Sequence, residues 1–583
     1  MAKLRSSLAV MSAPAGWGRV PSGPTSFIRE LPIVLGGLGL FYSGITFARY
    51  WSSPVTSQAE ISLQVAALPK YALFSVLRIA VAYLLSLMFT LIYGYVAAYN
   101  RRAERIMVPL LDTLQSIPVL SFLPPVMISM VALFPTRQLG LELGCVLLIF
   151  TGQVWNMTFS FYSSLKSIPT EMREAAAAYR LSWWQRFWQL ELPSAAIGLI
   201  WNSMMSVAGG WFFLMACEMF VLGARDFRLP GLGSYLQTAA NAGDTKAISF
   251  GLAAMIGVIV LIDQVVWRPV IAWAEKFKLE QVAASEVPRS PILNLLRSSR
   301  LLPFLSRSVV RPISDRLDSH FAQANMRAAE SKKHAPRWAI WSVLTVIAAG
   351  IAYAFIRLAA TLATISAAEL RHLLAGAGAT FLRVEVALLL AALWTVPVGI
   401  AIGLRPRLSA VAQPIAQIAA SIPATALFPI VLLVLIRAGG GIGTGSVLLL
   451  LLGTQWYVLF NVIAGATAIP EDLKEVCATY RFSSRERWRT LLLPGIFPYL
   501  ITGLVTASGG AWNASIVAEY FHFRGQTIST LGLGAIISNA TDDGNFRLLL
   551  SATVVMALIV VSVNRLVWRR LYTQAATKYK LEA

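Results

Sequence analysis

Long apolar windows separated by short polar stretches dominate this chain. A bilayer core about 30 Å thick requires about 20 consecutive apolar residues in a helix. Windows of roughly this length occur at 31–50, 72–98, 118–134, 140–161, 196–222, 248–268, 338–365, 377–404, 411–436, 446–467, 496–519 and 546–567. The pattern predicts an all-α integral membrane protein with about twelve spanning helices. Pro124, Pro125 and Pro429 favour a kink or a broken, re-entrant helix in two of these windows.

The two halves of the chain repeat one another. At an offset of 305 residues, Arg78 matches Arg383, and at an offset of 301 residues Glu174 matches Glu475 and Glu218 matches Glu519. Self-similarity over this length indicates an internal duplication. With an even number of crossings in each copy, the repeats are parallel and related by an axis along the membrane normal.

The duplication predicts the domain organisation. We expect a cytoplasmic tail at 1–30, a first repeat at 31–273, a basic cytoplasmic linker at 274–336 and a second repeat at 337–583. The linker is either a tether that lets the halves pair or a segment that touches anionic lipid, and we favour the tether. The transport pathway is expected between the repeats.

Composition and charge support the membrane class. Hydrophobic residues make up 57% of the 583 residues and charged residues only 13%, against roughly 45–50% and about 25% in a soluble domain. The net charge of +21 comes mostly from Lys and Arg in segments that face inward if the N-terminus is cytoplasmic. Both termini are therefore expected in the cytoplasm, and a nucleic-acid partner is not expected.

A polar loop lies between the fourth and fifth windows of each half. In the first copy, Thr170 is expected to cap a short helix, Leu181-Ser182 to form a turn, and Pro193 to end a second short helix. The second copy repeats this plan up to Leu493-Pro494. The two loops, which we call the elbows, span 170–193 and 471–494.

Motifs in and after the elbows resemble a known family. Glu174-Ala175-Ala176 followed by Leu192-Pro193 is similar to the signature loop of permease subunits of bacterial ABC importers. Glu218-Met219, Gly231-Leu232-Gly233 and Asp263 resemble the nitrate/sulfonate/taurine/bicarbonate branch, and Glu519-Tyr520 and Gly532-Leu533-Gly534 answer them in the second half. Arg180 and Arg481 stand where the family usually has the loop glycine. Either the turn comes one residue later or these arginines make a contact that glycine cannot.

The resemblance implies a type I ABC importer permease fold and a division of labour between subunits. Each elbow would hold a coupling helix that docks on a cytoplasmic ATPase, which binds ATP and Mg, while a periplasmic or lipid-anchored binding protein delivers the solute. The implied location is the bacterial inner membrane. The expected coupling residues are Glu171, Glu174, Ala175, Ala176, Arg180, Pro193, Glu471, Glu475, Ala478, Arg481 and Pro494.

The chain itself is not expected to be an enzyme. No Lys follows a Gly anywhere in the sequence, so the phosphate-binding Gly-x-x-x-x-Gly-Lys-Ser/Thr loop is absent. Four scattered histidines and three cysteines give no metal-ligand spacing. We therefore expect no catalytic residue, no metal and no cofactor in this chain.

Charged or bulky residues within the apolar windows are candidates for the pathway. Inserting an ionisable side chain at mid-bilayer costs roughly 2.5–3.5 kcal/mol of free energy. Such residues are therefore candidates for a functional role. Glu218 and Glu519 either gate the pathway or are structural carboxylates that bind the Gly-Leu-Gly loop. Arg78 and Arg383 either snorkel to the membrane surface or face the pathway and attract an anion. Trp211 and Trp512 either close a gate or pack between helices.

The function expected from these features is import of a small anionic solute with ATP hydrolysed by separate subunits. The alternative from another class is a twelve-span secondary transporter driven by an ion gradient. Only the first class requires the duplicated cytoplasmic elbow. The sequence does not identify the solute.

Overall fold

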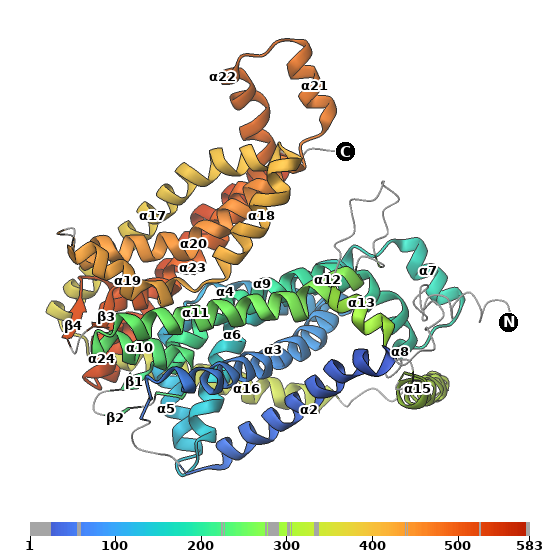
Figure 1. Cartoon of the computed structure of the whole chain (residues 1–583), viewed down its shortest axis with the longest axis horizontal. Helices are drawn as coiled ribbons and strands as arrows, with labels where there is room; N and C mark the ends of the chain where they lie inside the picture. Colours follow the sequence, from blue (N-terminus) through green and yellow to red (C-terminus); the bar gives the residue numbers. More distant parts are fainter. Residues whose placement is uncertain are drawn as a thin grey trace. The chain divides into compact units, whose positions relative to one another are not determined.

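The computed structural model is almost entirely helical, with two short β-hairpins (Figure 1). It describes residues 25–54, 60–222, 225–226, 228–274, 277, 291–299, 304, 306–330, 337–437, 439, 441–523 and 526–578. The predicted all-α class is confirmed. Most of the expected N-terminal tail and several parts of the linker lie outside the described residues.

The first half contains a fixed order of helices and one hairpin. The elements are α2 (Thr25–Ser52), α3 (Leu68–Tyr99), α4 (Arg101–Ser116), α5 (Leu123–Leu133), α6 (Leu139–Lys166), α7 (Thr170–Ala178), α8 (Trp183–Arg186), α9 (Leu192–Glu218), β1 (Val221–Leu222), β2 (Arg225–Asp226), α10 (Leu232–Ala242), α11 (Thr245–Ile262) and α12 (Arg268–Ala274). The linker contributes α13 (Pro291–Ser298) and α15 (Arg311–Glu330).

The second half repeats this order element by element. Its elements are α16 (Arg337–Leu362), α17 (Ala367–Gly403), α18 (Pro406–Ser421), α19 (Ala424–Arg437), α20 (Ile442–Thr467), α21 (Glu471–Thr479), α22 (Ser484–Arg487), α23 (Leu493–Ala518), β3 (Tyr520–Phe523), β4 (Gln526–Ser529), α24 (Leu533–Asp542), α25 (Phe546–Val563) and α26 (Arg569–Lys578). Even the π-helical turns recur, at Phe187–Glu191 and Trp488–Leu492 and at Asp263–Trp267 and Asn564–Trp568. The duplication therefore extends to local backbone detail.

The number of spanning helices differs from the expected twelve. Within the described residues, eight helices are long and apolar enough to cross a membrane: Val65–Tyr99, Leu139–Lys166, Trp183–Glu218, Thr245–Ala274, Ala367–Gly403, Ile442–Thr467, Ser484–Ala518 and Phe546–Ala575. A ninth is possible if the pair Arg101–Gln115 and Val119–Leu133, bent by 86°, is counted as one span. The count of twelve is therefore not confirmed.

The windows at 118–134 and 411–436 explain part of this difference. Here α5 has only 11 residues and α19 only 14. At a rise of 1.5 Å per residue, helices of about 16 and 21 Å cannot cross a 30 Å core alone. Each follows a break at the matching segments Ser116-Ile117-Pro118 and Ser421-Ile422-Pro423, where proline disfavours helical geometry in the preceding residue.

The chain falls into two compact units. One unit contains Met1–Tyr50, Met157–Met204 and Val260–Ile340, and the other contains Trp51–Asn156, Met205–Ile259 and Trp341–Ala583. The units do not coincide with the sequence repeats, since the second unit holds parts of both halves. Glu218, Glu519 and both Gly-Leu-Gly loops lie in this second unit, whereas the first elbow lies in the other.

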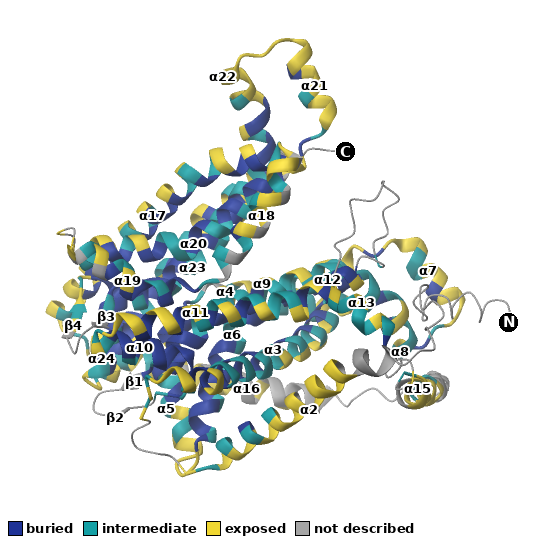
Figure 2. Cartoon of the chain, viewed as in Figure 1, coloured by how far each residue is buried: buried dark blue, intermediate teal, exposed yellow. Residues whose placement is uncertain are grey.

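The long helices have an exposed face and a face that packs against other helices (Figure 2). On α3, Leu84, Met88 and Ile92 are exposed, while small or polar residues such as Ser75 and Thr90 are buried. The helix α17 shows the same division. Apolar residues outside and small residues inside are typical of membrane helices, because small residues let helix backbones approach closely.

Candidate functional site

The first elbow consists of α7, a tight turn and α8, which continues through a π-helical turn into α9. A hydrogen bond connects the elbow to α6: Arg173 Nη2 donates to the carbonyl of Leu165 at 2.6 Å. Ala176 is the buried residue of α7, whereas Glu174 and Ala175 are exposed. The elbow therefore presents most of its surface outward. The two short helices expected here are present.

The second elbow has the same construction from α21 and α22. Cys477, the counterpart of Ala176, is its buried residue, and Glu475 and Tyr480 are exposed. Tyr480 is 73% exposed, and its counterpart Tyr179 is 67% exposed. In Figure 1, α21 and α22 lie at the end of α20 and α23 opposite to the β3–β4 hairpin.

The arginines that replace the family's loop glycine make the turn itself. Arg180 and Arg481 have φ values of 51° and 52°, in the left-handed region that glycine favours. After α7, Arg180 N donates to Ala177 O at 2.9 Å and Leu181 N to Ala176 O at 3.1 Å. These two bonds form a Schellman C-cap, and the second elbow repeats them. The turn is therefore not displaced by one residue, and its left-handed backbone is one that glycine adopts without strain.

A capping box starts the second helix of each elbow. Ser182 donates its backbone N–H to Gln185 Oε1 at 3.1 Å and accepts from Gln185 N at 3.3 Å. Ser483 pairs with Glu486 in the same way. Each box satisfies two N–H groups that have no partner within the helix. The predicted turn at Leu181-Ser182 is confirmed.

Two expected details of the first elbow are wrong. Thr170 is the first residue of α7 rather than its cap, because Pro169 holds the N-cap position without a side-chain hydrogen bond. Pro193 does not end a helix, because it lies in the first turn of α9, in one continuous span from Trp183 to Glu218. A proline in the first turn is tolerated, since the π-helical turn before it accommodates the missing N–H.

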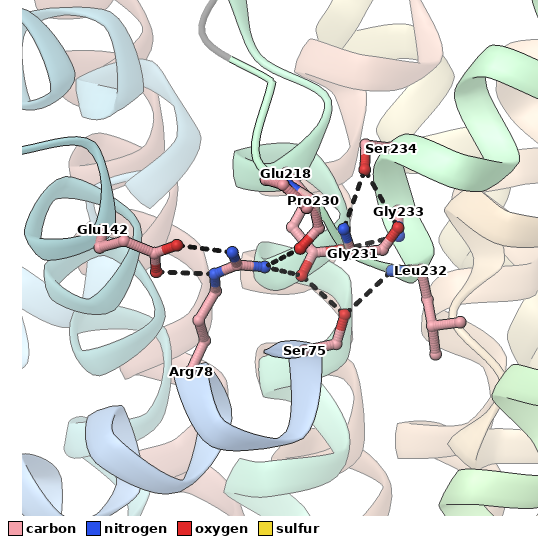
Figure 3. Close-up of polar contacts among 9 residues, drawn as sticks. All are labelled: Ser75, Arg78, Glu142, Glu218, Pro230, Gly231, Leu232, Gly233 and Ser234. Carbon is pink, nitrogen blue, oxygen red and sulfur yellow. Dashed lines mark hydrogen bonds and ion pairs between the residues drawn. The ribbon is translucent and has the colours of Figure 1, made fainter. Parts of the chain in front are cut away.

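In the second unit, Arg78 joins two carboxylates in a fully buried network (Figure 3). Its guanidinium donates from Nε and Nη2 to Glu142 at 2.7 and 2.6 Å. Its Nη1 donates to Glu218 Oε1 at 2.7 Å and to the carbonyl of Pro230 at 2.9 Å. A bidentate pair plus a second carboxylate leaves this guanidinium well satisfied without water.

Glu218 also binds the Gly-Leu-Gly loop. It accepts from Ser75 Oγ and from Gly233 N, both at 2.7 Å, and Ser75 Oγ in turn accepts from Leu232 N at 3.0 Å (Figure 3). A Cβ on Gly231 would lie 2.2 Å from the Glu218 carboxyl group. Glycine is therefore required here for close approach of the loop to the carboxylate.

The second half contains the equivalent network with one carboxylate fewer. Arg383 Nη1 donates to Glu519 Oε1 at 2.8 Å and to Leu531 O at 2.7 Å, and Nη2 donates to Thr530 Oγ1 at 2.9 Å. Glu519 also accepts from Thr380 Oγ1 and from Gly534 N, each at 2.8 Å. Here the arginine side chain is 15% exposed, whereas Arg78 is fully buried.

The networks bear on the two roles considered for Arg78 and Arg383, which were snorkelling to the membrane surface and attracting an anion in the pathway. Arg78 does not snorkel, because it is completely buried between helices. Each guanidinium is paired with at least one carboxylate, so neither offers a free positive charge to an anion. The bonds expected between Glu218, Glu519 and the Gly-Leu-Gly loops are present, whereas a gating role stays a prediction.

The tryptophans are buried in helix packing. Trp211 is 2% exposed and Trp512 is fully buried. Beside Trp211, a Cβ on Gly210 would lie 2.4 Å from the Gln153 side chain, so this glycine permits close helix contact. A role in closing a gate stays a prediction.

Four side chains of the networks were not predicted from the sequence: Ser75, Glu142, Thr380 and Thr530. Ser75 and Thr380 match at the offset of 305 and both carry a hydroxyl group, so the repeat alignment contained the signal. Glu142 has no acidic counterpart in the second half, and no pattern in the sequence pointed to it. Among the described residues, no group of three or more His, Cys, Asp or Glu is arranged to hold a metal ion.

Comparison with known proteins places these features in a family. The family model described as binding-protein-dependent transport system inner membrane component matches residues 90–266 and 395–573, more than half of the chain. The chain belongs to this family. Each match contains one elbow and one loop-binding carboxylate, so both copies carry the family's structure. The resemblance found from the elbow motifs is confirmed.

The chain is also similar to individual permeases. It is 30% identical over 188 residues to the nitrate import permease protein NrtB of Synechococcus elongatus, covering 32% of this chain and 64% of that protein. It is 28% identical over 182 residues to the taurine transport system permease protein TauC of Escherichia coli, covering 31% and 62%. A bicarbonate transport system permease protein, CmpB of Synechococcus elongatus, is 26% identical over 189 residues, covering 32% and 65%. The matched segment thus spans slightly less than two thirds of each relative.

Proposed function

We propose that this chain is the permease component of an ABC importer in a bacterial inner membrane, with both permease repeats fused in one polypeptide. The observation that carries the proposal is the pair of elbows, which repeat the same Schellman turn and capping box within two matches to the family. Two copies of one docking structure suit a pair of motor subunits. The termini are proposed to lie in the cytoplasm with the elbows.

The chemistry of ATP hydrolysis belongs to partner subunits in this proposal. Two ATPase subunits, which bind ATP and Mg, dock at the exposed faces that carry Glu174 and Glu475. A periplasmic or lipid-anchored binding protein delivers the solute on the other side. ATP drives transport because it binds one arrangement of the complex more tightly than the other.

The helix α23 supplies a path for the force in the second half. It has 26 residues, about 39 Å at 1.5 Å per residue. One end continues from the second elbow, and the other leads directly to Glu519 and its loop-binding network. In this proposal, a displacement of the elbow moves α23 and, with it, the hairpin and loop at the far end.

The proposed solute is small and carries an acidic group. This class rests on the relatives, whose names specify nitrate, taurine and bicarbonate. Arg78 and Arg383 do not add support for an acidic solute. Their charges are neutralised by Glu142, Glu218 and Glu519.

The experiment is reconstitution of the chain with its ATPase and binding protein in liposomes. Glu174→Ala combined with Glu475→Ala should abolish ATP-driven uptake while leaving ATP hydrolysis running. A matched control, Glu60→Ala combined with Asp315→Ala, removes two exposed carboxylates outside the elbows and should leave uptake unchanged.

The outcome separates the proposal from a secondary transporter. Uptake that survives the elbow substitutions would refute docking at the elbows. Uptake by the chain alone, driven by an ion gradient without ATPase, would refute the importer and support the alternative.

A further inference from the structure

The linker helix α15 packs against the first elbow. Both lie in the same compact unit, and Figure 1 shows α15 end-on beside α8. On α15, Leu317 and Phe321 are half-buried, whereas Ser319 and His320, which lie between them in the sequence, are exposed. Leu317 and Phe321 are four residues apart, so they lie on one side of the helix. The helix therefore has one partly buried apolar face and one polar face.

Phe321 packs on the aromatic side chains of α8. The centroid of its ring lies 5.2 Å from that of Trp184, with 21° between the ring planes, and 5.9 Å from that of Trp183, with 70° between the planes. Aromatic pairs prefer such stacked and edge-to-face arrangements. Within the elbow, the ring of Trp183 lies 6.2 Å from that of buried Phe187, and the ring of Trp184 lies 5.4 Å from that of Trp188. One phenylalanine of the linker thus joins an aromatic cluster of the elbow.

This cluster is directly connected to α9. Phe187 begins the π-helical turn Phe187–Glu191 between α8 and α9. Across the turn, Arg186 Nε donates to Oε1 of the fully buried Glu191 at 2.7 Å. The helix α8, the turn and α9 form one continuous span, Trp183–Glu218. A contact that fixes α8 therefore restricts the movement of the elbow relative to the first turns of α9.

The second elbow does not repeat this aromatic surface. At the offset of 301, the residues that correspond to Trp183, Trp184 and Trp188 are Ser484, Arg485 and Arg489. Three indole rings are thus replaced by one hydroxyl group and two guanidinium groups. The two elbows share their turn and their capping box but differ in the side chains of α8 and α22. The surface that receives Phe321 is therefore specific to the first elbow.

The linker leads directly from this contact into the second repeat. Helix α15 ends at Glu330, and α16, the first helix of the second repeat, begins at Arg337. Only the segment 331–336 separates them in the chain. A helix that is held on the first elbow therefore connects this elbow to the second repeat through a short segment.

We propose that α15 is a strap that holds the first elbow in position through Phe321, so that the linker is a working part of one docking site as well as a tether between the repeats. A helix bound to anionic lipid would place its apolar face in the membrane surface. Here the ring on that face contacts Trp183 and Trp184 instead. The role of the strap in docking rests on the proposed importer function, whereas the contact itself does not.

Hydrogen exchange measured by mass spectrometry on the purified full chain, in nanodiscs of neutral lipid and without ATPase, tests the contact. In Phe321→Ala, the backbone amides of α8 should exchange about tenfold faster, because two ring pairs that stabilise the ordered elbow are lost. The amides of α22 in the second elbow should be unchanged. Phe321→Tyr keeps the ring and should retain the protection of α8. The matched control Phe304→Ala removes a phenylalanine of the same linker that is 66% exposed, and it should leave α8 unchanged.

Nanodiscs that contain anionic lipid distinguish the strap from a lipid-bound helix. The strap predicts the same protection of α8 in neutral and in anionic nanodiscs, since the contact is made within the chain. Two results would overturn the inference. One is equal exchange of α8 in the unchanged chain and in Phe321→Ala. The other is protection of α8 and α15 that appears only with anionic lipid, as expected for a helix attracted to the membrane surface.

A second measurement tests the role of the strap in docking. In liposomes with the ATPase and the binding protein, Phe321→Ala should raise the number of ATP molecules hydrolysed per solute imported, whereas Phe321→Tyr should not. An unchanged ratio despite faster exchange of α8 would overturn this role. Because the exchange experiment contains no ATPase, failure of the importer proposal would leave its result standing. Unaltered protection of α8 in Phe321→Ala would count against the strap alone.

Discussion

Replacing Arg78 should lower the stability of the folded chain far more than replacing Glu142, although the two side chains share a bidentate ion pair. Arg78→Met deletes four hydrogen bonds and leaves Glu142 and Glu218, both fully buried, without a counter-charge. Breaking a buried pair from one side costs about 3–5 kcal/mol, because the remaining charge is uncompensated. With two carboxylates remaining, the cost should lie at the upper end of this range.

Glu142→Gln removes one negative charge from the same network and keeps the positive charge of Arg78. It leaves one guanidinium and one carboxylate, which is the composition of the Arg383–Glu519 network in the second half. That network shows that one pair with Ser or Thr support is sufficient to hold the loop. We expect a cost of about 1 kcal/mol, the value of an ordinary hydrogen bond that is weakened rather than lost.

Arg383→Met provides the matched comparison. It removes three hydrogen bonds from a side chain that is 15% exposed, and Glu519 keeps its bonds to Thr380 and Gly534. Its cost should lie between those of Arg78→Met and Glu142→Gln. Thermal unfolding of each purified variant in nanodiscs gives the order. The reasoning is refuted if the Arg78→Met variant unfolds at the same temperature as the Glu142→Gln variant or at a higher one.

Three further substitutions and one matched control test the local geometry, each by thermal unfolding of the purified chain. Arg481→Gly should stabilise the second elbow by up to about 1 kcal/mol, because glycine adopts the left-handed turn without strain; a less stable variant would mean that the side chain makes a necessary contact. Gly532→Ala should cost about 1–3 kcal/mol, since its Cβ would lie 2.1 Å from Glu519 Oε2. Gly509→Ala, which has open space around the new Cβ, should cost nothing, and equal effects of the two would contradict the steric argument. Gln153→Leu should stabilise by about 1–3 kcal/mol, because Gln153 is fully buried and neither side-chain amide atom has a hydrogen-bond partner within the described chain; destabilisation would reveal a hidden partner.

Much of the candidate site could be predicted because its signals are local in the chain. The elbow motifs, the turn at Leu181-Ser182 and the Gly-Leu-Gly loops each occupy a few consecutive residues. The repeat alignment then placed Arg78 with Arg383 and Glu218 with Glu519. It did not show that these residues bind one another, because arginine and glutamate in each pair are separated by well over a hundred residues.

The membrane class, the duplication and the family resemblance followed from the amino-acid order alone, because apolar length, self-similarity and elbow motifs are local or repeated along the chain. The folded structure was needed to show that Arg78 lies between Glu142 and Glu218 and that Arg180 and Arg481 adopt left-handed backbone conformations in the elbow turns. These features depend on which helix faces approach one another. Hydropathy does not specify that approach, since it counts apolar residues without fixing the partner of each polar one.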